Sequence, residues 1–252
     1  MLTAADTAYS IATIRAREGD RPPEQRLFED PYAAIFSAAG AHAAEGTRRL
    51  VEAPYVVEGV RLRTRFIDDF VREGVLASVA QVVLLGAGFD ARGLRLPEIA
   101  AQGATVYEVD FAAQLEKKRA LLDAAGVVLP PHLRYVACDF SAPDFEETLT
   151  SELAAQGFRA GAGALFVWEG VIAYIGDEAR DRSLRFMVRA GGPGSRLVFD
   201  FWAQVMEGAE RARLAGFTRF SEIGFDALWR RHFPGESSWE YAGMGRMGTA
   251  FL

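Results

Sequence analysis

Apolar and polar residues follow one pattern in the first third of the chain and another in the rest. From Thr3 to about Glu73, apolar residues recur at three- to four-residue spacing, as in the stretch 62–70, and this spacing predicts helices. Prolines at 22–23 and at 31 interrupt the pattern, because the residue before a proline is pushed out of helical geometry. We therefore predict several short helices, with the small-residue tract 38–50 forming either a mobile connection or an Ala-rich helix.

After Gln81, short apolar runs alternate with helical segments. The runs predict buried strands at 82–86, 105–110, 133–139, 163–170 and 195–201. Helices are predicted at 111–126 and at 142–157, the second with Ser141 or Asp144 as its N-cap. The tail predicts a helix at 225–233 and an edge strand at 237–245.

This alternation of strands and helices predicts an α/β fold. We expect a doubly wound, mostly parallel, Rossmann-like sheet at 76–252, preceded by a helical extension at 1–75 that belongs to the same domain. In such sheets ligands bind at the carboxyl ends of the strands, near the topological switch point.

Composition narrows the classes of partner. The chain of 252 residues is half apolar and a quarter charged, with a mean hydropathy of +0.04, as in ordinary globular proteins. We find neither an apolar run of about 18 residues nor a basic, apolar leader, so we expect no membrane association and a cytoplasmic location. A net charge of −6 disfavours nucleic acid as a partner. One cysteine, Cys138, and three scattered histidines (His42, His132 and His232) predict no internal disulfide and no metal site.

The stretch "GAGFDARG" at 86–93 lies between a predicted strand and a predicted helix. Glycines at this position let the backbone approach a ligand while helix N–H groups point toward it. Gly86-x-Gly88-x-x-Ala91 also matches a dinucleotide fingerprint, although a single match of this kind has low specificity. Three interpretations are open: a dinucleotide loop, a loop for another adenosine cofactor, and a tight turn.

Acidic residues at successive strand ends favour one of these interpretations. Glu108 and Asp110 close the second predicted strand, where a carboxylate can accept hydrogen bonds from ribose hydroxyls. Asp139 closes the third strand and Glu169 the fourth. A pyrophosphate would gain little from these carboxylates, whereas a positively charged sulfonium ligand is electrostatically compatible with them.

Several motifs, in order along the chain, resemble one protein family. They are "TAYSIATIRAREG" (7–19), "FEDPYAAIF" (28–36), "RTRFIDDFV" (63–71), "VVLLGAGFDARGLRL" (82–96), "VYEVDF" (106–111) followed by Lys117, "ACDF" (137–140) and "FVWEGVIAYI" (166–175). Together they resemble the leucine carboxyl methyltransferase-like family of S-adenosylmethionine-dependent methyltransferases, including its bacterial polyketide O-methyltransferase members. The resemblance covers nearly the whole chain.

The resemblance implies roles for individual residues. Arg63 or Arg65 would hold the methionine carboxylate of S-adenosylmethionine, with Arg63 the expected one, and Glu169 would face its amino group. Asp110 or Glu108 would bind the ribose, and Asp139 with Phe140 would flank the adenine, although the family more often has leucine in place of Phe140. The complete set of predicted cofactor-binding residues is Arg63, Gly86, Ala87, Gly88, Asp90, Glu108, Asp110, Phe111, Asp139, Phe140, Glu169 and Gly170.

We therefore predict an S-adenosylmethionine-dependent O-methyltransferase that modifies a carboxyl or hydroxyl group of a small, polyketide-like acceptor and releases S-adenosylhomocysteine. Predicted acceptor contacts are Tyr9, Arg17, Tyr32, Tyr174 and Trp202, with Arg15 and Met206 as further candidates. A carboxylate acceptor needs no base. Tyr174, Glu169 and His232 are candidate bases for a hydroxyl acceptor, but a cofactor or core contact is the preferred role for each, and we assign no catalytic residue. The alternatives are an NAD-dependent oxidoreductase and a non-catalytic cofactor-binding protein of the same fold.

Overall fold

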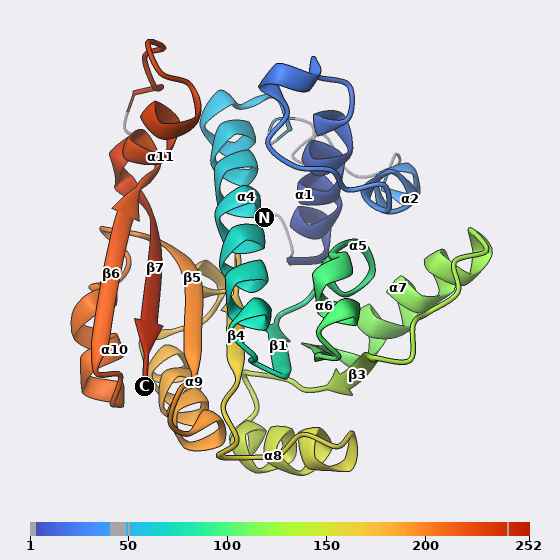
Figure 1. Cartoon of the computed structure of the whole chain (residues 1–252), viewed down its shortest axis with the longest axis vertical. Coiled ribbons are helices and arrows are strands. Elements are labelled where there is room, and N and C mark those ends of the chain that lie inside the picture. Colours follow the sequence, from blue (N-terminus) through green and yellow to red (C-terminus); the bar gives the residue numbers. More distant parts are fainter. Residues whose placement is uncertain (1–3, 41–48, 50, 241) are drawn as a thin grey trace.

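Seven strands form one sheet in the computed structural model, which describes residues 4–40, 49, 51–240 and 242–252 (Figure 1). The strands are β1 (Gln81–Leu85), β2 (Thr105–Asp110), β3 (Leu133–Ala137), β4 (Leu165–Trp168), β5 (Arg196–Trp202), β6 (Arg219–Gly224) and β7 (Gly245–Phe251). Their order across the sheet is β3-β2-β1-β4-β5-β7-β6. The first five are parallel, and β7 runs antiparallel to both β5 and β6, so the predicted doubly wound, mostly parallel sheet is confirmed.

Helices cover both faces of this sheet (Figure 1). They are α1 (Ala4–Glu18), α2 (Ala33–Ala39), α4 (Pro54–Leu76), α5 (Arg92–Arg95), α6 (Pro97–Ala101), α7 (Ala112–Ala124), α8 (Phe145–Ala155), α9 (Asp177–Gly191), α10 (Gly208–Ala215) and α11 (Phe225–His232), with short 3-10 turns at Pro23–Gln25, Ile172–Tyr174 and Ala242–Met244. Helices α4, α6 and α11 pack on one face, and α8, α9 and α10 pack on the other.

Successive side chains of each strand point to opposite faces of the sheet and therefore belong to two separate apolar cores. In β1, Val82 and Leu84 pack with α4, while Val83 and Leu85 pack on the face that α8 and α9 cover. A strand that is buried on both faces consists of consecutive apolar residues, as "QVVLL" does apart from Gln81. The same parity rule applies to β2, β4 and β5, and it decides on which face each strand-end carboxylate lies.

Two predictions about local structure are wrong. Helix α4 has 23 residues, not the few expected in this part of the chain, because a continuous stripe of apolar residues, including Leu62, Ile67 and Val71, packs on the sheet. The predicted edge strand at 237–245 is irregular apart from a 3-10 turn, as far as its described residues go, and Gly245 begins β7. Strands β6 and β7 were not predicted. Strand β6 is a half-exposed edge strand of mixed polarity, and the buried strand β7, "GRMGTAF", has glycines and polar residues between its apolar ones.

The tract 38–50 falls mostly on residues outside the described part of the chain, and the division of the chain at residue 75 stays a prediction. Among the described helices, none combines the length and the apolar character that a bilayer-spanning segment requires.

Candidate functional site

Four carboxylates lie on the α4 face of the sheet, at or beside the carboxyl ends of its strands. Glu108 and Asp110 belong to β2, Glu169 follows β4 directly, and Asp200 lies near the end of β5. Residues of the same parity, two to four positions earlier, pack in the core beside α4: Val106, Val167 and Val198. Because successive side chains point to opposite faces, this parity places all four carboxylates on one side.

The turn after β1 depends on glycine conformations. Gly86 and Gly88 have φ angles of +72° and +48°, a region that other residues adopt at a cost. A Cβ on Gly86 would also overlap the side chain of Val171, from the loop after β4. Asp110 fixes the turn, because its carboxylate accepts hydrogen bonds from the backbone N–H of Gly88 (2.6 Å) and of Phe111 (2.7 Å). Burial raises the pKa of Asp110, although both N–H groups favour its ionised form.

An ion-pair cluster joins α4 to the ends of β4 and β5. Arg63 donates through Nε to Glu169 (2.8 Å) and through Nη1 to Asp200 (3.1 Å). The other carboxylate oxygen of Asp200 accepts from the backbone N–H of Gly170 (2.6 Å), and a Cβ on Gly170 would lie 3.4 Å from Arg63 Nη2. The cluster therefore draws together a helix, a strand and a glycine turn that are far apart in the sequence.

Arg92 binds the second oxygen of Glu169. Its Nη1 donates to Glu169 Oε2 (2.7 Å) and to the carboxylate of Asp90, and its Nε donates to Asp68 on α4 (2.8 Å). Asp68 also accepts from Arg95 (2.6 and 2.7 Å). Charge-assisted hydrogen bonds of this kind are among the stronger ones in proteins. They therefore fix the positions of α4, α5 and the loop after β4 relative to one another.

The surrounding charges set the protonation of this cluster. Burial by itself would raise the pKa of Glu169, but Arg92, Arg63 and Arg15 together lower it well below its usual range. Burial raises the pKa of Asp200, because Arg63 only partly offsets the loss of water and the charge of Glu169 adds to it. Glu169 is therefore an anion at any physiological pH.

Glu108 lies behind the glycine turn and has no access to solvent. Lys118 of α7 donates to its carboxylate (2.5 Å) and also to the backbone carbonyl of Asp90. Burial raises the pKa of Glu108 to about 7, against the attraction of Lys118. Of the two predicted ribose-binding residues, Asp110 binds the backbone of the turn and retains 9% exposure, whereas Glu108 is fully buried beneath the turn.

Asp139 and Phe140, which were predicted to flank the adenine, and Phe111, a further predicted cofactor-binding residue, are divided between surface and core. Phe111 is 50% exposed, and Asp139 is exposed and accepts from the backbone N–H (2.8 Å) and Oγ (2.5 Å) of Ser141. Phe140 is buried against Phe145, with 6.0 Å between ring centroids. An exposed aromatic face is therefore present at Phe111.

The predicted acceptor residues also fall into two groups. Tyr9 packs on Phe89 of the glycine turn (4.8 Å between ring centroids), and Tyr32 packs in the same small cluster. Arg17 donates to the backbone carbonyl of Val51 (3.1 Å). Tyr174 and Trp202, by contrast, are 49% and 39% exposed, beside the carboxyl ends of β4 and β5.

Helix phase distinguishes the two arginines of the "RTR" motif. Arg63 points to the strand ends, whereas Arg65 binds Asp69 one turn along α4 (2.8 Å) and the backbone carbonyl of Leu27 (3.2 Å). Arg15, a further acceptor candidate, is buried between Asp30 and the carbonyl of Phe89.

Asp68 and Asp200 are not among the predicted site residues, and the sequence marked Arg92 only as a residue to inspect beside the glycine turn. A signal for Asp200 was available, because it interrupts the apolar run "LVFDF" two residues after Val198, with the parity that Glu169 has to Val167. For Asp68 and Arg92 we find no comparable signal, since these residues are 24 positions apart in the sequence and lie on two different helices.

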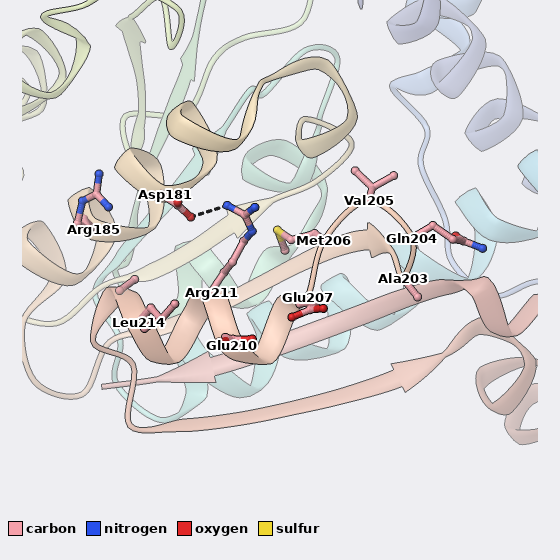
Figure 2. Close-up of a pocket in the computed structure, with 11 residues that line it drawn as sticks. Asp181, Arg185, Ala203, Gln204, Val205, Met206, Glu207, Glu210, Arg211 and Leu214 are labelled. Carbon is pink, nitrogen blue, oxygen red and sulfur yellow. Dashed lines mark hydrogen bonds and ion pairs between the residues drawn. The ribbon is translucent and has the colours of Figure 1, made fainter.

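A cavity of about 590 Å³ lies away from this cluster, between α9, α10 and the segment 203–207 (Figure 2). Figure 2 shows Arg211 reaching across it to Asp181 (2.7 Å), with Met206 among the lining residues. Met206 packs with Phe199 and Phe201, which lie on the face of β5 opposite to Asp200. The cavity is thus on the other side of the sheet. In the described part of the chain, we find no group of His, Cys, Asp and Glu that is arranged to hold a metal ion.

The chain matches a family model and has relatives of similar sequence. The leucine carboxyl methyltransferase family model matches residues 8–188. A protein of Mycobacterium avium, provisionally named an S-adenosyl-L-methionine-dependent methyltransferase, is 33% identical over 230 residues, which is 87% of this chain and 73% of the relative. One of Parafrankia sp. with the same provisional name is 36% identical over 239 residues, 92% of this chain and 73% of the relative.

Two solved structures share the architecture. A provisionally named methyltransferase of Thermobifida fusca has a TM-score of 0.63 at 20% identity and covers 87% of this chain and 92% of its own. A DUF574 family protein of Streptomyces avermitilis has a TM-score of 0.61 at 16% identity over 98% of this chain and 99% of its own. At these identities the likeness shows the fold alone.

Proposed function

The chain belongs to the leucine carboxyl methyltransferase family and is an S-adenosylmethionine-dependent methyltransferase, and on this premise we propose that it methylates oxygen. The proposed acceptor is a carboxyl or hydroxyl group of a small molecule, with polyketide-like acids and phenols as the first class to test. The oxygen acceptor is supported by the family, which is described as that of leucine carboxyl methyltransferases. The observation that supports the cofactor site is the pairing of Arg63 with Glu169 beside Gly170, at the carboxyl ends of β4 and β5.

The residues present fit S-adenosylmethionine. Arg63 Nη2 makes no hydrogen bond to any described residue, so one arm of a planar fork remains for the carboxylate of the cofactor. Glu169 is an anion suited to its ammonium group, and Asp110 lies beside the glycine turn, where a ribose would bind. The exposed ring of Phe111 offers a surface for the adenine. When bound, the cofactor supplies an electrophilic methyl group on a positively charged sulfur.

The protein's own contribution to such a transfer is positioning. A displacement in line with the sulfur–carbon bond needs acceptor and donor aligned, and alignment of this kind supplies about 7–11 kcal/mol in favourable cases. A carboxylate is already a nucleophile, so this proposal includes no catalytic base. Tyr174 and Trp202 are the predicted acceptor residues with exposed rings near the cluster, and we propose that they contact the apolar body of the acceptor.

The experiment is a transfer assay with isotopically labelled S-adenosylmethionine and a panel of small carboxylic acids, phenols and matched amines, read by mass spectrometry. We expect labelled methyl esters or ethers. Labelled amines without labelled acids or phenols would contradict O-methylation. Tight binding of S-adenosylhomocysteine without product across the panel would favour a non-catalytic protein of this fold, and saturable binding of NADH alone would favour an oxidoreductase.

A further inference from the structure

Glu169 is held by a different guanidinium at each of its two oxygens. Arg63 binds Oε1 at 2.8 Å, and Arg92 binds Oε2 at 2.7 Å. The two arginines differ in access, since the side chain of Arg63 is 14% exposed and that of Arg92 is 1% exposed. Arg63 can thus meet a ligand directly, whereas Arg92 lies behind Glu169.

Arg92 is itself anchored from three directions. Besides Glu169 it binds Asp68 on α4 and the carboxylate of Asp90 in the glycine turn, and its backbone N–H donates to Asp90 (2.7 Å). Asp68 is in turn held by Arg95. A guanidinium with these anchors has little freedom to move, so the carboxylate it binds has little freedom either.

We propose that Arg92 is a positioning residue, which holds the Glu169 carboxylate in place beside Arg63, where it meets the ammonium group of the cofactor. The inference rests on the proposed role of Glu169 in the cofactor site. Arg92 touches neither cofactor nor acceptor in this proposal, and it acts only through Glu169.

Electrostatics supports a separate contribution from Arg92. Burial raises the pKa of Glu169 when it is unopposed, and Arg92 makes the largest contribution that lowers it, followed by Arg63. The charged groups around Glu169 are Arg63 and Asp68 on α4, Arg92 on α5, Asp90 in the glycine turn, Asp200 on β5 and Arg15 on α1. Without Arg92, the remaining charges offset the effect of burial on the pKa of Glu169 less completely. The carboxylate then takes up a proton at a higher pH.

The experiment compares Arg92→Gln with Arg65→Gln, which removes a half-exposed arginine from the same region. The dissociation constant of S-adenosylhomocysteine is measured by calorimetry from pH 5 to pH 8, after a thermal transition has shown that each protein is folded. For the Arg92→Gln protein we expect weaker binding at pH 8 and a further loss of about tenfold or more on acidification to pH 5, since one pKa unit corresponds to a factor of ten. The dissociation constants of the wild type and of the Arg65→Gln protein should show the same dependence on pH.

A purely structural role would give a loss that is the same at both pH values, and that result, or wild-type affinity throughout, would overturn the proposal. Arg92→Lys decides the matter if Arg92→Gln does not fold. A lysine keeps the charge but cannot bridge three carboxylates, so we expect roughly tenfold weaker binding and a pH profile close to that of the wild type. Wild-type affinity in the Arg92→Lys protein would refute positioning.

Glu169→Gln separates this inference from the premise beneath it. If Glu169→Gln binds S-adenosylhomocysteine as tightly as the wild type, the proposed role of Glu169 fails. If Glu169→Gln binds weakly while Arg92→Gln matches the wild type at every pH, only the role of Arg92 fails.

Discussion

The two halves of the strand-end site are constructed differently. The half at β1 and β2 is a backbone structure: two glycines with positive φ angles form the turn, and Asp110 fixes it through hydrogen bonds to backbone N–H groups. The half at β4 and β5 consists of side chains, in which Arg63 and Arg92 pair with carboxylates from three other elements. Conformation limits substitution in the first half, and charge balance limits it in the second.

The largest effect is expected in the half that consists of charges. Glu169→Gln removes the anion between Arg63 and Arg92. Breaking a buried ion pair in this way should lower the free energy of unfolding by about 3–5 kcal/mol. Urea unfolding of the variant and the wild type would measure it. Because domains are typically stable by about 5–15 kcal/mol, a folded protein should remain. A decrease in the free energy of unfolding below about 1 kcal/mol would show that the ion pairs of Glu169 with Arg63 and Arg92 do not stabilise the fold appreciably.

In the half that consists of backbone, the largest effect should come from Gly86→Ala. The substitution combines a positive φ of 72° with an overlap against Val171, and together these should lower the free energy of unfolding by roughly 2–4 kcal/mol. Gly103→Ala is the matched control, since Gly103 has a φ of 66° and nothing within 4 Å of its added Cβ. Equal melting temperatures for the two variants would contradict the role given to Val171.

A binding measurement addresses the carboxylate of the backbone half. Asp110→Ala should weaken S-adenosylhomocysteine binding by about 1.5–3 kcal/mol, the usual contribution of a hydrogen bond to a charged group. Calorimetric titration gives the value directly. Unchanged affinity would refute the ribose assignment, and Asp139→Ala in parallel shows whether the exposed carboxylate after β3 contributes as well.

The smallest effect is a dependence on pH. The pKa of Glu108 is raised by burial to about 7 in the folded protein, so the folded state keeps a proton that the unfolded state has released. The contribution of this group to stability is complete below about pH 4.5 and is lost as the pH rises to about 7. Urea unfolding at pH 5 and pH 8 should therefore show a decline in the wild type that exceeds the decline in Glu108→Gln by about 2 kcal/mol. Parallel declines would contradict the assignment.

Much of the fold could be predicted because its causes are local. The five parallel strands follow from consecutive apolar runs, and the turn after β1 follows from two glycines between a strand and a helix. The last two strands could not be predicted in the same way, because β6 is half-exposed with residues of mixed polarity and β7, although buried, has glycines and polar residues in place of a consecutive apolar run. The length of α4 was also misjudged, although the proline at its start was visible in the sequence.

The sequence by itself determined which chemical groups stand at the strand ends, and its ordered motifs indicated the family. Only the tertiary structure decided which groups meet: Arg63 and not Arg65 faces Glu169, Glu108 lies behind the turn against Lys118, and Arg92 lies between α4 and the loop after β4. The physical reason is that an ion pair depends on the rotational phase of a helix and the register of a strand. Packing of the whole chain fixes both, and no local run of residues specifies them.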